Sequence, residues 1–189
     1  ATLMRSQFGV NVRVTNNSWV AGTEPDSNLY AAIAAAGAAD ILFVAAAGNG
    51  DVLGRGYDLD ADPHYPAAFD LDNILTVAAT NAKDGLARFS NYGLQTVDIA
   101  APGIAIVSTE PGGQYGSRNG TSMAAPQVTG VAALLWSRVS YATAAEVREA
   151  ILQGADSIAG LQDKVGGGRR LNAHGALLVD TAAPLATLV

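Results

Sequence analysis

Two short runs of the chain, ILFVAAA (41–47) and ILTVAAT (74–80), are apolar at almost every position. A strand with one face in water alternates apolar and polar residues, whereas a strand buried on both faces has no need to alternate. Runs of this length therefore predict central strands of a parallel sheet. Because helices cover both faces of such sheets, the predicted fold class is α/β, a parallel β-sheet flanked by helices.

The rest of the sequence fits this alternation of strands and helices. Thr143 and Glu146 form a Thr-x-x-Glu capping box, which predicts a helix ending near Gly154. The segment 48–73 is dense in Gly, Asp and Pro and predicts a loop. The other predicted elements are strands at 10–16, 96–101 and 104–109, and helices from Ser27 to Ala38, from Ser122 to Val139 and from Leu171 to Val179.

Composition excludes several classes of partner. With 189 residues, of which 49% are hydrophobic and 15% charged, the chain can bury one sizeable core, so one domain is expected. A net charge of -6 and scattered Lys and Arg residues argue against a nucleic-acid partner. Cysteine is absent, which excludes disulfides and thiolate metal sites. Glycine and aspartate interrupt the apolar stretch 30–47, so no membrane partner is expected.

The segment SRNGTSMAAPQVTGVAALLW (117–136) is the strongest candidate for a functional site. It places Ser122 at the start of a long apolar helix, where unpaired N–H groups and the positive end of the helix dipole favour developing negative charge. Gly120 permits close approach of another backbone, and Pro126 is expected within the first helical turn, where its missing N–H is no loss. The alternative is an ordinary helix N-cap, since Ser and Thr are common before apolar runs.

The complete string NGTSMAAP resembles the nucleophile motif of the subtilisin family of serine endopeptidases. Further blocks resemble other parts of that family's catalytic domain, in the family's order. They are NNSWV (16–20), FVAAAGN (43–49), ARFSNYG (87–93), DIAAPG (98–103) and GGRRLNAHGAL (167–177). The resemblance implies that residues 1–180 are the C-terminal portion of a subtilisin-like peptidase domain and that 181–189 form a tail.

The resemblance also implies roles for individual residues. Ser122 would be the nucleophile that forms an acyl-enzyme, and Asn49 would donate its side-chain amide to the oxyanion together with the Ser122 N–H. An asparagine between two glycines is otherwise a common turn residue. The walls of the pocket before the cleaved bond would be Ser18, Trp19 and Val20 on one side and Ala46, Ala47 and Gly48 on the other. The implied substrate is an extended protein or peptide, and the implied location is extracellular.

A histidine and an aspartate that the family needs are missing before Ser122. Serine requires a histidine as general base, and neither His64 nor His174 stands in a matching sequence context. The chain is therefore expected to be a fragment that is incomplete at the N-terminal side and inactive alone. We expect it to expose a strand edge and an apolar face, and to pair with the missing N-terminal portion or with itself. The alternative is a noncatalytic subtilisin-like binding or structural domain.

Two residues depart from the family pattern. Val20 stands where glycine is usual, which predicts crowding of the substrate pocket. Gln127 replaces a histidine that is not the catalytic one, so this change says little about activity.

Other patterns are weaker. GNGDVLG (48–54) is followed by a loop instead of a helix, which excludes a dinucleotide fingerprint. Asp58, Asp60 and Asp62 imitate the start of a calcium-binding EF-hand, but Pro63 stands where glycine is needed. No cofactor is expected to be required and no metal ligand is nominated, although a structural calcium ion between Asp58 and Asp72 stays open.

Overall fold

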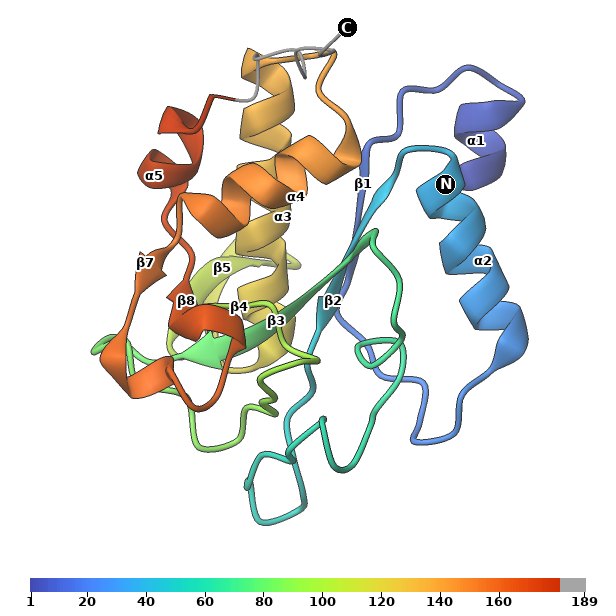
Figure 1. Ribbon diagram of the computed structural model, residues 1–189. Helices are drawn as coiled ribbons and strands as arrows, with labels where there is room; N and C mark the ends of the chain where they lie inside the picture. Colours follow the sequence, from blue (N-terminus) through green and yellow to red (C-terminus); the bar gives the residue numbers. More distant parts are fainter. Residues whose placement is uncertain (181–189) are drawn as a thin grey trace, which may run out of the picture.

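The computed structural model describes residues 1–180, in which six strands form one sheet in the order β1-β2-β3-β4-β8-β7 (Figure 1). β1 to β4 and β8 run parallel, and β7 pairs antiparallel with β8. The strands are β1 (Val14–Asn17), β2 (Leu42–Ala46), β3 (Ile74–Thr80), β4 (Ile99–Pro102), β7 (Asp156–Ser157) and β8 (Arg169–Arg170). The α-helices are α1 (Thr2–Ser6), α2 (Ser27–Ala38), α3 (Thr121–Arg138), α4 (Ala144–Gln153) and α5 (Ala173–Leu178), and two 3-10 turns span Ala159–Leu161 and Gly166–Gly168.

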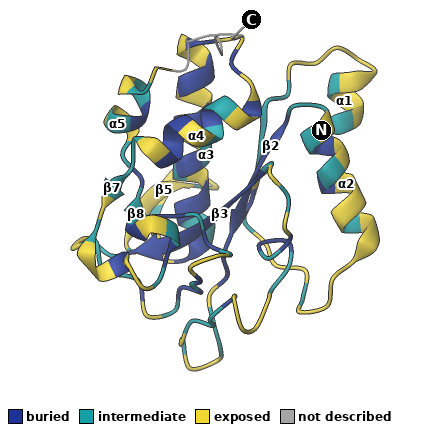
Figure 2. Ribbon diagram, in the orientation of Figure 1, coloured by how far each residue is buried: buried dark blue, intermediate teal, exposed yellow. Residues whose placement is uncertain are grey.

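Helices cover both faces of the sheet, which confirms the predicted α/β class. α2 lies on one face, and α3, α4 and α5 lie on the other (Figure 1). Alternate residues of β2 serve the two layers, since Leu42 and Val44 join the core beneath α3 whereas Phe43 and Ala45 join the core beneath α2. Figure 2 shows the central strands buried along their length, as continuous apolar runs require.

Several predicted boundaries are confirmed. α2 and β3 begin and end at the predicted residues. The capping box of α4 forms, because the Thr143 side chain accepts from the Glu146 N–H while the Glu146 carboxylate accepts from the Thr143 N–H.

The predicted strand at 10–16 is wrong in its first half. β1 starts only at Val14, and the preceding residues turn back on α1, where Val10 N–H donates to Met4 O and Arg5 donates to Val12 O. The predicted strand at 96–101 is also displaced, to β4, because Val97 N–H bonds Gly93 O in a turn.

The predicted strand at 104–109 is found at 106–110, and it does not belong to the parallel sheet. Instead, β5 (Ile106–Glu110) pairs antiparallel with β6 (Gln114–Arg118), a strand that the sequence analysis did not predict. The turn between them contains Gly112 and Gly113, both with positive φ, and such a glycine pair favours a tight hairpin.

α3 packs against the sheet but is not covered by protein on every side. One face is exposed to solvent and consists of Pro126, Gly130, Ala133, Leu134 and Ser137. The exposed fraction of Leu134 is 51%. In addition, β1 has β2 as its neighbour on one side and no strand of the described residues on the other.

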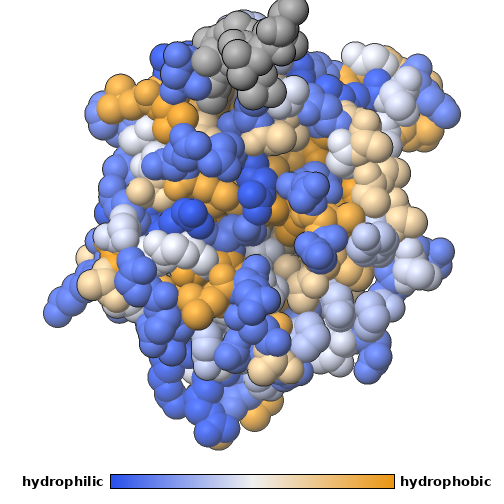
Figure 3. Space-filling model, viewed as in Figure 1, coloured by the Kyte–Doolittle hydropathy of each residue, from blue (hydrophilic) through white to orange (hydrophobic). Residues whose placement is uncertain are grey.

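Apolar side chains also reach the surface elsewhere. Figure 3 shows them gathered between α2 and α4 on the face in view. Within residues 1–180, no helix is both long enough and apolar enough to cross a membrane. The predicted tail, residues 181–189, lies outside the described part of the chain.

Candidate active site

Three segments meet at the carboxyl ends of the parallel strands. Ser18–Val20 follows β1, Ala47–Asn49 follows β2, and Thr121–Ser122 begins α3. Parallel α/β sheets form their ligand sites at this edge. The structure therefore brings together the predicted site residues, with Ala46 as the last residue of β2.

Ser122 and Ser18 are joined by two reciprocal hydrogen bonds. Ser122 Oγ donates to Ser18 O at 3.2 Å, and Ser18 Oγ donates to Ser122 O at 2.9 Å. Ser122 O is available because Pro126, four residues on, has no N–H to complete the helical bond. Pro126 thus lies in the second helical turn, which corrects its predicted place in the first, and the Ser18 hydroxyl supplies the missing donor.

The side chain of Asn49 is held by its oxygen, and within residues 1–180 its nitrogen donates no hydrogen bond. Asn49 Oδ1 accepts from Thr121 N at 2.9 Å and from Thr121 Oγ1 at 3.0 Å. An amide oriented in this way can offer both Nδ2–H donors to a ligand. Ser122 is the second residue of α3, so its N–H is among those with no partner within the helix. Donors of this kind can stabilise negative charge on a ligand.

Thr121 is a site residue that sequence reasoning missed. It is fully buried, and its hydroxyl accepts from Gly48 N at 3.1 Å while it donates to Asn49. The hydroxyl therefore joins the turn after β2 to the start of α3. The sequence could have identified Thr121, because this residue lies inside the NGTSMAAP motif.

Asn91 fixes the same turn from the other side. It is buried, its N–H donates to Gly48 O at 3.0 Å, and its Nδ2 donates to Ala47 O at 2.8 Å. A β-carbon on Gly48 would lie 2.6 Å from Asn91 Nδ2, so only glycine fits here.

The two predicted pocket walls stand close together. Trp19 and Val20 are exposed at 42% and 43%, whereas Ala46, Ala47 and Gly48 are buried. A Val20 methyl carbon lies 3.5 Å from where a β-carbon of Gly48 would be. Val20 thus lies beside Gly48, and the crowding of a substrate by Val20 stays a prediction.

Neither histidine contacts Ser122. His64 lies beside the Tyr57 ring, with a centroid distance of 4.8 Å, and its Nε2 is 3.8 Å from Asp62. His174 is exposed on α5. Within residues 1–180, the hydrogen bond that Ser122 Oγ donates goes to the Ser18 carbonyl and not to a titratable group.

A hollow of about 220 Å³ opens beside Ser122 on the side of the β5–β6 hairpin. Ser122, Met123 and Pro126 line it from α3, and Glu110 and Arg118 line it from the hairpin.

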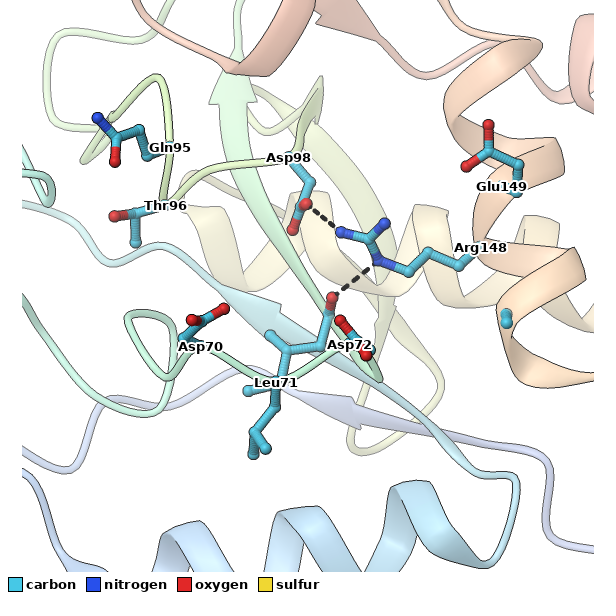
Figure 4. Close-up of a pocket in the computed structure, with 10 residues that line it drawn as sticks. Asp70, Leu71, Asp72, Gln95, Thr96, Asp98, Arg148 and Glu149 are labelled. Carbon is cyan, nitrogen blue, oxygen red and sulfur yellow. Dashed lines mark hydrogen bonds and ion pairs between the residues drawn. The ribbon is translucent and has the colours of Figure 1, made fainter.

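A larger hollow, of about 370 Å³, lies at the opposite edge of the sheet (Figure 4). Arg148 reaches into it from α4 and donates to Asp98 Oδ1 at 2.5 Å and to Ile74 O at 3.1 Å. Burial raises the pKa of Asp98 and outweighs the opposing effects of Arg148 and the Thr76 N–H. The ion pair links α4 to the start of β4, far from Ser122 along the strands.

The loop that contains Asp58, Asp60 and Asp62 is stabilised through one of its carboxylates. Asp60 accepts from the N–H groups of Leu94, Gln95 and Thr96. Burial tends to raise the pKa of Asp60, but the bonds from Thr96, Gln95 and Leu94 lower it on balance. In the described part of the chain, no group of three or more His, Cys, Asp or Glu residues is placed to hold a metal ion.

Comparison with known proteins gives matches along most of the chain. The family model described as the subtilase family, Peptidase_S8, matches residues 2–176. The chain is 42% identical over 139 residues to thermitase of Thermoactinomyces vulgaris, which is 74% of this chain and 45% of thermitase. The chain thus spans less than half the length of this relative.

Solved structures agree. The fold is similar to a chain in a structure of subtilase cytotoxin SubAB assembly, with a TM-score of 0.75, 31% identity, and coverage of 87% of this chain and 57% of that one. It is also similar to the prenylagaramide maturation protease PagA, with a TM-score of 0.74, 27% identity, and coverage of 94% and 67%. Sequence and fold lead to the same conclusion: this chain belongs to the subtilase family.

Proposed function

We propose that this chain carries the nucleophile and the oxyanion hole of a serine endopeptidase, and that it is inactive until another segment supplies the general base. The observation that carries the proposal is the position of Ser122 next to Asn49, whose amide oxygen is bound by Thr121 and whose nitrogen is uncommitted. Family membership supports the same reaction.

The proposed reaction is acyl transfer. Ser122 Oγ attacks the carbonyl carbon of a peptide bond, and its proton passes to the general base and then to the leaving amine. The negative charge that develops on the carbonyl oxygen is stabilised by Asn49 Nδ2 and the Ser122 N–H. Water then hydrolyses the acyl-enzyme. Without a base, the Ser122 hydroxyl keeps its proton and donates it in the hydrogen bond to Ser18 O.

A fluorophosphonate probe tests this directly, because stable labelling needs an activated serine. We expect no mass adduct on the chain alone. We expect one adduct, mapped to Ser122, when the chain is joined to the N-terminal portion of the thermitase domain. Ser122→Ala in the joined protein is the control. An adduct at Ser122 in the isolated chain would show that a residue of this chain acts as the base.

We further propose that the partner of this chain is the missing N-terminal portion, which would cover the free edge of β1 and the exposed face of α3. Both surfaces belong to elements that are otherwise part of the core, and the coverage of thermitase leaves room for further elements. We expect the isolated chain to sediment as self-associated species. A monomer of 19.2 kDa that unfolds cooperatively would contradict this.

A noncatalytic subtilase domain is the second candidate. The hydrogen bond of Ser122 Oγ to a backbone carbonyl favours it, because this bond gives the serine proton, within residues 1–180, an acceptor that is not a base. The joined protein separates the two candidates, since a noncatalytic domain stays unlabelled there. Three further proposals rest on the family. The protein is located outside the cell, it requires no cofactor, and a structural calcium ion binds near Asp58–Asp72.

A further inference from the structure

A second concave site lies away from Ser122, between the start of α2 and the loop that precedes β3. Its volume is about 430 Å³, which is within the range of small-ligand pockets. Three aromatic residues and two carboxylates line most of it: Tyr30, Tyr65, Phe69, Asp26 and Asp70. We call this the aromatic pocket.

The three rings form one cluster. The Tyr30 and Phe69 ring centroids are 5.4 Å apart in an edge-to-face arrangement, and those of Tyr65 and Phe69 are 4.5 Å apart. Phe69 is buried and forms the floor, whereas Tyr30 is 42% exposed. Such a cluster offers negative ring faces to an organic cation.

The charge around the rings has one sign. Asp26 and Asp70 are the charged residues among those that line the pocket, and neither is in an ion pair within residues 1–180. Asp70 also lines the neighbouring hollow, where Figure 4 shows it on the same loop as Asp72. An aromatic floor with acidic residues around it is complementary to a cation.

An anion is a poorer fit, although the pocket adjoins a helix N-terminus. Asp26 Oδ1 already accepts from the N–H groups of Asn28 and Leu29, at 2.7 and 3.2 Å. The carboxylate therefore occupies the donors that an anion would need, and it counters the positive end of the α2 dipole.

The pocket is tied to the segment that follows the predicted substrate wall. Ala21 N donates to Tyr65 O, and Tyr65 N donates to Gly22 O, both at 2.8 Å. Residues 21–22 continue directly from Ser18–Val20. A polypeptide extended along that wall would thus pass toward the Tyr65 side of the aromatic pocket.

We propose that the aromatic pocket binds the side chain of an arginine or lysine in a polypeptide. The guanidinium or ammonium group would lie against the Tyr30 and Tyr65 rings, with the charges of Asp26 and Asp70 close by. That this polypeptide is a substrate rests on the proposed function. The binding of the cation does not, so the experiment is designed to need no catalysis.

The test is an NMR titration, with N-acetyl-arginine amide, of the chain joined to the N-terminal portion that would cover its self-associating surfaces, and carrying Ser122→Ala so that no catalysis takes place. We expect saturable shifts at the amides of Ser27, Tyr30 and Ala68, with a Kd on the order of 1 mM, the strength typical of a ligand this small. N-acetyl-citrulline amide, the neutral isostere, should bind at least about fivefold more weakly, because one unit charge pair at 4 Å in water contributes about that factor. Added salt should remove most of the difference.

Variants locate the site. Tyr30→Leu should weaken arginine binding about two- to fivefold, the factor that corresponds to an exposed cation–π contact, while Tyr30→Phe should retain it. Asp26→Asn keeps a cap for α2 while it removes the charge, and should also weaken binding. Tyr141→Leu and Asp72→Asn are matched controls, since the first is an exposed tyrosine elsewhere and the second lines only the neighbouring hollow.

Equal affinity for the arginine and citrulline probes would overturn the proposal, and so would shifts that map to the Asp98–Arg148 hollow instead. Unchanged affinity in a folded Tyr30→Leu chain would overturn it as well. None of these results would bear on Ser122, whose role is tested by the fluorophosphonate experiment alone.

Discussion

Replacing Asn49 with alanine is expected to lower kcat by about 10²- to 10³-fold in the joined, active protein, with little change in KM. That magnitude is the one known for the oxyanion asparagine of subtilisin, so it is carried over from this family. The structure supplies the orientation, since Thr121 holds the amide oxygen. Under the proposed function, the amide nitrogen would then meet charge that exists only in the transition state.

Variants of Thr121 separate the contribution of the Asn49 amide to kcat from that of the hydroxyl that orients it. Thr121→Val removes the hydroxyl that orients Asn49 and should cost about two- to tenfold in kcat, the value of one neutral hydrogen bond, while Thr121→Ser should restore it. Asn28→Ala, on the exposed surface of α2, should leave kcat unchanged. If Asn49→Ala raised KM and left kcat intact, the amide would be a ground-state contact and the oxyanion role would be wrong.

The sequence predicted those parts of the fold that local patterns control. β3 and α2 were predicted to the residue, because a doubly buried strand and an alanine-rich helix both have strong local signals. The hairpin of β5 and β6 was missed although its glycine pair was visible. An apolar run does not reveal whether its partner strand lies in the main sheet or next along the chain.

The candidate site shows the same division. Ser122 and Asn49 were identified from motifs, but the motifs do not say how the two are connected. The connection is tertiary: Thr121 bonds residues of the β2 turn 72 and 73 positions away in sequence, and Ser18 bonds Ser122 across 104. The misplacement of Pro126 shows why this matters, since its effect on Ser122 O becomes clear only when Ser18 is seen beside it.

Breaking the pair of Asp98 and Arg148 is expected to cost about 2–3 kcal/mol in the free energy of unfolding, the upper range for hydrogen bonds to charged groups. Asp98→Ala removes the acceptor of both Arg148 and the Thr76 N–H and leaves a partly buried guanidinium (Figure 4). Arg148→Met should cost a similar amount, and the double variant less than the sum. Urea denaturation at pH 7, well above the ordinary pKa of a carboxyl, measures all three.

An exposed pair provides the control. Asp163 and Lys164 are neighbours in sequence with side chains 76% and 35% exposed, so Asp163→Ala should cost about 0–0.5 kcal/mol. If Asp98→Ala cost no more than this, the ion pair would not connect α4 to the sheet in any energetic sense.

The pH dependence has a defined sign. Because burial raises the pKa of Asp98, the folded chain keeps this proton to a higher pH than the unfolded chain does. The stability that wild type has over Asp98→Asn should therefore decrease as the pH rises above about 4.

Asp60 has a lowered pKa, so the stability of wild type over Asp60→Asn should instead be present above pH 4 and be lost as the pH falls below it. Unfolding free energies from pH 3 to 7 should diverge in opposite directions for the two variants. Parallel curves would show that the two carboxyls have the same environment, contrary to the burial of Asp98 and the three N–H donors around Asp60.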